Sequence, residues 1–149
     1  EAICQAVVPM IARIGIKISL NAQTKGKHFD KIGAREGYKT SFYMLGWTPG
    51  TSDGLNALQN LMALSGQGNG IWNSGRYTNP TVEELTAKIA VEMAPAKRRQ
   101  MMDEAFRIHK EEFGHLPLHQ QALAWGLRNG IDMPQPAFDA VMARYVRVN

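Results

Sequence analysis

The sequence is poor in cysteine, in long apolar runs and in charge of one dominant sign, and each scarcity excludes a class of protein. A single cysteine, Cys4, rules out an internal disulfide framework, and because no activating base is apparent we expect a buried thiol. The longest uncharged apolar runs, such as the one at residues 42–47, are far shorter than the ~20 residues of a membrane span. With 44% hydrophobic and 20% charged residues, the composition excludes general disorder.

The charge is mildly basic, with 17 Lys and Arg against 13 Asp and Glu, a net charge of +4. The basic residues are scattered, and their densest run has the spacing of the solvated face of a helix. No helix-turn-helix spacing or aromatic-basic RNA motif accompanies the charge, so we expect no nucleic-acid partner. That run comprises Lys25, Lys27, Lys31, Arg35 and Lys39.

A chain of 149 residues suits one domain or two small ones, and the spacing of its apolar residues predicts several helices. We expect helices over residues 2–14 with a kink or break at Pro9, over 26–35, after Gly54, from Asn79-Pro80, and from Pro95. In the last two helices, the side chains expected to face inward are Leu85, Ile89, Met93, Met102, Phe106 and Phe113.

Strand patterns alternate with these helices. Residues 16–20 alternate apolar with polar side chains, and residues 41–47 are almost continuously apolar, which is typical of a central strand. Residues 116–128 are predicted to be extended, and residues 143–148 to form a terminal strand. Because strands that alternate with helices form βαβ units, we expect an α/β fold with a mixed, mostly parallel sheet flanked by helices.

The turn-forming segment TPGTSDG at residues 48–54 follows the predicted central strand and is the best candidate for a binding site. In α/β sheets, ligands bind beyond the carboxyl ends of strands. Trp47 would supply a flat apolar surface, and Thr48, Ser52 and Asp53 would supply polar groups. The alternative for Asp53 is that it only caps the helix that begins at Gly54.

Two histidines near the C-terminal third are candidates for other chemistry. Pro117 separates His115 from His119 and disfavours a helix, so the pair would stand ~13 Å apart on an extended chain. One metal ion could not bind both, and we expect no metal or other cofactor. A small hydrolase or transferase that uses His115 or His119 is the alternative function, although no catalytic signature appears. His28 and His109 are expected to be solvated.

Several segments, taken in order, resemble the C-terminal part of a bacterial extracellular solute-binding protein of family 5, the dipeptide- and oligopeptide-binding group of ABC-importer receptors. The resemblance spans nearly the whole chain. It implies that residues 1–149 are a single domain, the C-terminal lobe of a two-lobed receptor, with a periplasmic-binding-protein-like fold. The segments are the helix and IGIKISL over 2–20, FYMLGWTPGTSDGLNAL at 42–58, RYTNPTVEEL at 76–85, KRRQMMDEAFRIHKEEFGHLPLHQQALAW at 97–125 and RYVRV at 144–148.

The resemblance implies a binding protein, not an enzyme. It would act in the periplasm, capture a peptide or similar small solute between this lobe and an absent N-terminal lobe, and deliver it to a membrane permease. Peptide-binding members hold the ligand's ammonium group with an Asp where this chain has Gly50, so a free peptide N-terminus would need another acid, such as Asp53. The implied ligand-binding residues are Gly46, Trp47, Thr48, Gly50, Ser52 and Asp53.

Overall fold

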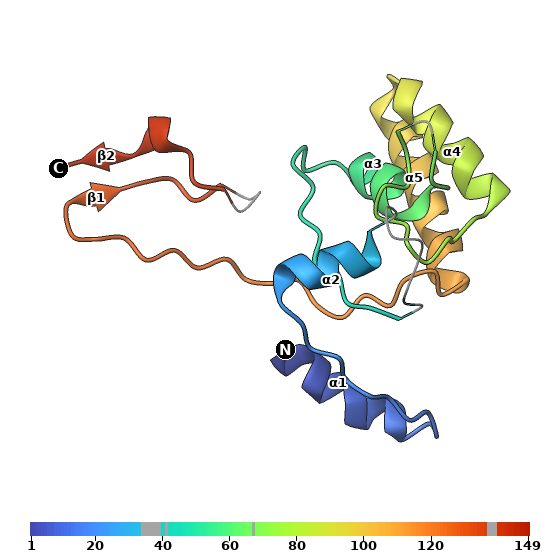
Figure 1. Ribbon diagram of the computed structural model, residues 1–149. Coiled ribbons are helices and arrows are strands. Elements are labelled where there is room, and N and C mark those ends of the chain that lie inside the picture. The colour runs from blue at the N-terminus through green and yellow to red at the C-terminus, as the bar shows by residue number, and fades with distance from the viewer. Residues whose placement is uncertain (34–39, 41, 67, 137–139) are drawn as a thin grey trace. The chain divides into compact units, whose positions relative to one another are not determined.

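The computed structural model describes residues 1–33, 40, 42–66, 68–136 and 140–149 and divides into two compact units, Glu1–Gly46 and Trp47–Asn149. None of the helices among these residues has the length and apolar character to cross a bilayer. In chain order the elements are α1 (Ala2–Ala12), α2 (Lys25–Ile32), α3 (Gly54–Ala57), the π-helical turn η2 (Leu58–Met62), α4 (Pro80–Val91), α5 (Pro95–Glu111), β1 (Ile131–Asp132), the 3-10 turn η3 (Ala143–Tyr145) and β2 (Arg147–Val148) (Figure 1).

The first unit contains α1 and α2. The helix α1 continues through Pro9 to Ala12, so the break considered at Pro9 does not occur, and Gly15 follows with a positive φ of 84°. The predicted helix over 26–35 corresponds to α2, which begins at Lys25 and ends at Ile32. Ile32 is buried, and residues 34 and 35 lie outside the described residues.

The second unit is organised around a helical core. Leu58 of η2, Val82 and Ile89 of α4, and Ala105 of α5 are completely buried and form one cluster. The helices α4 and α5 pack side by side as a hairpin (Figure 1), because only residues 92–94 connect them. Partly buried side chains that surround this cluster are Leu55, Met62, Leu85, Met101, Met102, Phe106 and Ile108.

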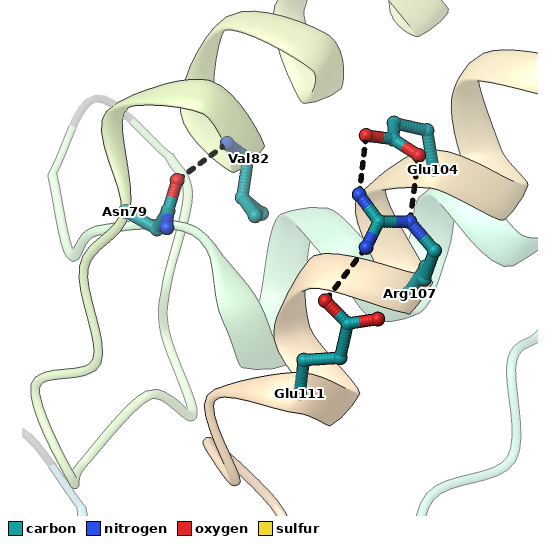
Figure 2. Close-up of polar contacts among 5 residues, drawn as sticks. All are labelled: Asn79, Val82, Glu104, Arg107 and Glu111. Carbon is teal, nitrogen blue, oxygen red and sulfur yellow. Dashed lines mark hydrogen bonds and ion pairs between the residues drawn. The ribbon is translucent and has the colours of Figure 1, made fainter.

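Local signals place the ends of these helices. The Asn79 side chain accepts a hydrogen bond from the backbone N–H of Val82 at 3.2 Å (Figure 2). It also accepts from the backbone N–H of Thr81 at 2.9 Å, and Pro80 occupies the first helical turn. The predicted start of α4 is therefore confirmed. Met93 and Phe113, which were predicted to face inward, are instead 89% and 75% exposed, because both lie beyond the ends of their helices.

The exposed face of α5 carries a charged network. The Arg107 guanidinium donates to both oxygens of Glu104, at 2.8 and 2.9 Å, and to Glu111, at 2.6 Å (Figure 2). These residues are three and four positions apart, so their side chains lie on neighbouring turns of one helix face. Because they are exposed, the pairs add little to stability but keep this face polar.

The α/β prediction is wrong: among the described residues helices make up 43%, and the sheet has two antiparallel strands. In that sheet Ile131 pairs with Val148 and Asp132 with Arg147. Residues 16–20, 42–47 and 116–128 form neither helix nor strand, and residue 41 lies outside the described part of the chain. Of the predicted terminal strand over 143–148, only Arg147–Val148 forms a strand, and Ala143–Tyr145 forms the 3-10 turn η3.

The exposure of these segments explains the error. Ile16 and Phe42 are 53% and 59% exposed, although the sequence pattern predicts that both would be at least half-buried. Side chains along 42–47 alternate between exposed and half-buried, so the segment is covered on one side at most. Apolar pattern creates a tendency to extend, but a strand also needs a hydrogen-bonded neighbour in register, and none pairs with these segments among the described residues.

We predict that Ile89→Ala lowers the free energy of unfolding by about 2–5 kcal/mol, because it leaves a cavity at the centre of the α4–α5 contact. The matched control is Val91→Ala on the same helix, where the side chain is 77% exposed, and its expected cost is below about 0.5 kcal/mol. Urea denaturation followed by circular dichroism measures both. Equal costs for the two variants would contradict the placement of the core.

Candidate functional site

The predicted binding turn lies at the start of the second unit. The backbone N–H of Ser52 donates to the carbonyl of Pro49 at 3.1 Å, which closes the turn. Ser52 has a φ of 53°, a left-handed conformation that a side chain other than glycine adopts at a cost of roughly 1–2 kcal/mol. Thr48, Gly50 and Ser52 are exposed. Among the described residues the hydroxyls of Thr48 and Ser52 make no hydrogen bond, so they are free to contact another molecule.

The indole of Trp47 is half-buried and held in place. Its Nε1–H donates to Oδ1 of Asn56, at 3.0 Å, and Asn60 donates from Nδ2 to the Asn56 backbone carbonyl at 2.7 Å. Asn56 lies in α3 and Asn60 in η2, so the two helical turns orient the ring. With its N–H occupied, Trp47 offers a partner its aromatic surface rather than a hydrogen-bond donor.

Asp53 is the N-cap of α3, as its capping alternative predicted. Its carboxylate accepts from the backbone N–H of Leu55 at 2.8 Å and from two guanidinium nitrogens of Arg98 at 2.7 and 3.1 Å. The hydrogen bond from Arg98, with that from Leu55, holds the pKa of Asp53 below its usual range. Both carboxylate oxygens are therefore engaged by groups of the protein, and the charge of Asp53 is balanced by α5.

Gly54 lets α3 approach α5 closely. A Cβ at this position would lie 3.0 Å from Cε2 of Phe106 and 3.3 Å from Sδ of Met102. The approach supports the ion pair between Asp53 and Arg98, which also joins these two elements. By contrast, a Cβ at Gly46 or at Gly50 would have no neighbour within 4 Å, so nothing in the structure requires glycine there for close packing.

Sequence reasoning missed Arg98 and Asn56. Arg98 is 45 residues from Asp53 and stands among other basic residues at the start of α5, so no local pattern distinguishes it. Asn56 is nine residues from Trp47 and looks like an ordinary polar position of a helix. The ion pair of Arg98 forms only when α3 and α5 are packed together, and the hydrogen bond of Asn56 forms only when Trp47 lies beside α3.

The histidines pair differently from the expectation. Nε2 of His109 lies 2.7 Å from Nδ1 of His115, whereas His119 is exposed. His109 was expected to be solvated, but only 3% of it is exposed, and burial lowers its pKa to about 4. Burial also lowers the pKa of His115. His28, likewise expected to be solvated, is half-buried and hydrogen-bonded to the Met44 carbonyl at 3.0 Å.

A polar network borders the histidine pair. The rings of Tyr77 and His109 meet in a T-shaped arrangement with 4.4 Å between their centroids, and the Tyr77 hydroxyl donates to Glu112 at 2.6 Å. Asn79 donates to the other oxygen of Glu112 at 2.7 Å. Burial, with the neighbouring Glu112 carboxylate, raises the pKa of Tyr77. The network thus ties the loop before α4 to the C-terminal end of α5.

No group of three or more His, Cys, Asp or Glu side chains is arranged to hold a metal ion among the residues that the structure describes. Cys4, expected to be a buried thiol, is half-buried and lies 3.6 Å from Sδ of Met44.

Comparisons with protein-family models, with curated proteins and with solved structures found no match to this chain. The resemblance to family 5 solute-binding proteins therefore rests on the sequence segments quoted above.

We predict that Asp53→Ser, which keeps a capping oxygen but removes the charge, and Arg98→Met each lower the free energy of unfolding by about 0.5–1 kcal/mol. The double variant should cost no more than either single variant, because both remove the same ion pair. Since the folded-state pKa of Asp53 is lowered, this contribution is present above its unfolded pKa of about 3.9 and is lost as the pH falls through the folded value. Urea denaturation of the four proteins at pH 7 measures the coupling, and strict additivity would contradict the pair.

Proposed function

We propose that this chain is part of an extracellular solute-binding protein of an ABC importer, in which Trp47 and the turn after it contact the solute. The solute would be captured between this part and an N-terminal lobe, in the periplasm, and passed to a membrane permease. The proposal includes no catalysis. It starts from the order of the family-like segments, from IGIKISL near the N-terminus to RYVRV at the C-terminus.

The observation that carries the proposal is the exposure of the turn next to an anchored indole. Thr48, Gly50 and Ser52 are exposed beside a Trp47 ring that Asn56 holds in a defined orientation. A turn that served only to connect elements would not need an anchored indole with unpaired hydroxyls next to it. A rigid aromatic surface flanked by polar groups is instead the usual composition of a small-molecule contact.

The charged groups around the turn restrict the class of ligand group that it could bind. Gly50 offers no carboxylate, and both oxygens of Asp53 are engaged by Leu55 and Arg98. Binding an ammonium group here would require breaking a partly buried ion pair. The proposed contact therefore uses hydroxyls, backbone N–H groups and the indole face, and the ligand contributes uncharged polar groups at this point.

The alternative function, a hydrolase or transferase using His115 or His119, gains no support from a specific contact. His115 is hydrogen-bonded to His109, and the Tyr77 ring packs against His109 in a T-shaped arrangement. The two histidines of the hypothesis are thus in different surroundings, one half-buried and one exposed.

The test is a titration of the isotopically labelled chain with trialanine, N-acetyl-trialanine and cellotriose, followed by NMR. Because the chain would supply only one side of the binding site, we expect weak affinity, with a Kd on the order of 1 mM. The amides of residues 48–52 and the Trp47 indole N–H should shift with at least one probe. N-acetylation should not weaken the response to the peptide, because no free carboxylate meets the ammonium group.

Matched variants localise the response. Thr48→Ala with Ser52→Ala should reduce the shifts, whereas Thr78→Ala, which removes an exposed hydroxyl outside the turn, should leave them unchanged. The proposal would be rejected if none of the three probes, at 10-fold the expected Kd of on the order of 1 mM, shifted any residue of the turn.

A further inference from the structure

The second unit contains a buried titratable pair that the proposed function does not use. Only 3% of His109, near the end of α5, is exposed, and its Nε2 faces Nδ1 of His115 across 2.7 Å. His115 lies beyond α5, at the start of a segment without regular structure. The hydrogen bond between the rings therefore holds the segment that follows α5 against the end of that helix.

The other nitrogen of His109, Nδ1, is buried and has no hydrogen-bond partner among the residues that the structure describes. A Cβ at Gly114 would lie 2.8 Å from it. A buried N–H without an acceptor is costlier than a bare acceptor, so the favoured neutral tautomer carries its proton on Nε2 and donates to His115. A further proton on His109 would have to occupy Nδ1, where no acceptor receives it.

Charged and titratable neighbours of His109 come from each side of the pair. His115 lies in the following segment, Glu112 stands at the end of α5, and Tyr77 comes from the loop before α4. Glu112 favours a single positive charge on the pair, but its two oxygens already accept from Tyr77 and Asn79. One proton added to the pair leaves an imidazolium that donates to an imidazole, whereas two added protons leave no lone pair between the rings and place two cations in contact.

We propose that the hydrogen bond between His109 and His115 is an acid-sensitive latch, which holds residues 112–115 on the end of α5 at neutral pH and releases them when both rings are protonated. Three backbone hydrogen bonds depend on this arrangement, from the N–H groups of Glu112, Phe113 and Gly114 to carbonyls of α5. Apart from the hydrogen bonds that the Glu112 carboxylate accepts from Tyr77 and Asn79, little else holds this stretch, because Phe113 is 75% exposed and has a positive φ of 54°.

Hydrogen exchange of the whole chain between pH 7.5 and pH 5 tests the latch. After correction for the intrinsic exchange rate, protection of the amides of Glu112, Phe113 and Gly114 should fall by at least about tenfold as the pH drops below the ordinary histidine pKa of about 6.5. Amides in the middle of α4 and α5 should keep their protection. Uniform loss throughout the second unit, or no loss at residues 112–114, would overturn the proposal.

The decisive variant replaces the pair by groups that cannot titrate in this range. In the double variant His109→Gln with His115→Asn, the side-chain amides take the positions of Nε2 and Nδ1 and can hydrogen-bond at any pH, so protection at residues 112–114 should become independent of pH. His119→Asn, at an exposed histidine, should keep the wild-type loss. Loss of protection in the double variant that matches the wild type would overturn the proposal.

A second measurement applies if the double variant does not fold. NMR titration of the wild-type histidine rings should show His109 and His115 taking up protons together with the loss of protection at residues 112–114. Separate midpoints for the rings and for the amides would mean that the pair does not control release.

Discussion

The structure of the second unit depends on one contact, the burial of Leu58 against α4 and α5. Leu58, Val82, Ile89 and Ala105 lose all contact with water, and no other cluster of described residues is as completely enclosed. Burying such side chains contributes roughly 1.5–3 kcal/mol each for the larger ones. This contact sets the distance between η2 and the α4–α5 hairpin. Two polar contacts of the unit, the Asp53–Arg98 ion pair and the His109–His115 hydrogen bond, involve α5 of this hairpin.

These two polar contacts have different consequences. At one place Asp53 caps α3 and pairs with Arg98 of α5, which neutralises the turn after Trp47 and leaves hydroxyls as its outward polar groups. At the other, His109 and His115 share a hydrogen bond that, in our proposal, breaks when both rings are protonated. The first arrangement bears on what a ligand would contact, and the second on how the chain responds to acid.

The fold was the largest error of sequence interpretation, and it has a specific cause. Residues 16–20 and 42–47 carry the apolar patterns of strands, and they are extended or irregular, but no strand pairs with them among the described residues. Pattern is a property of a few consecutive residues, whereas a sheet needs partners that can come from anywhere along the chain. The family resemblance carried the same expectation of a sheet and did not correct it.

Local features were readable from the residues. Asn79 before Pro80 marks the start of α4, and Asp53 before Gly54 marks the start of α3, because capping involves a side chain and backbone groups only two or three residues away. The contact of Arg98 with Asp53, the burial of His109 and the exposure of Phe113 required the packed chain. Each of these depends on where helices end and on which residues distant in sequence then become neighbours, and no short stretch of sequence encodes that.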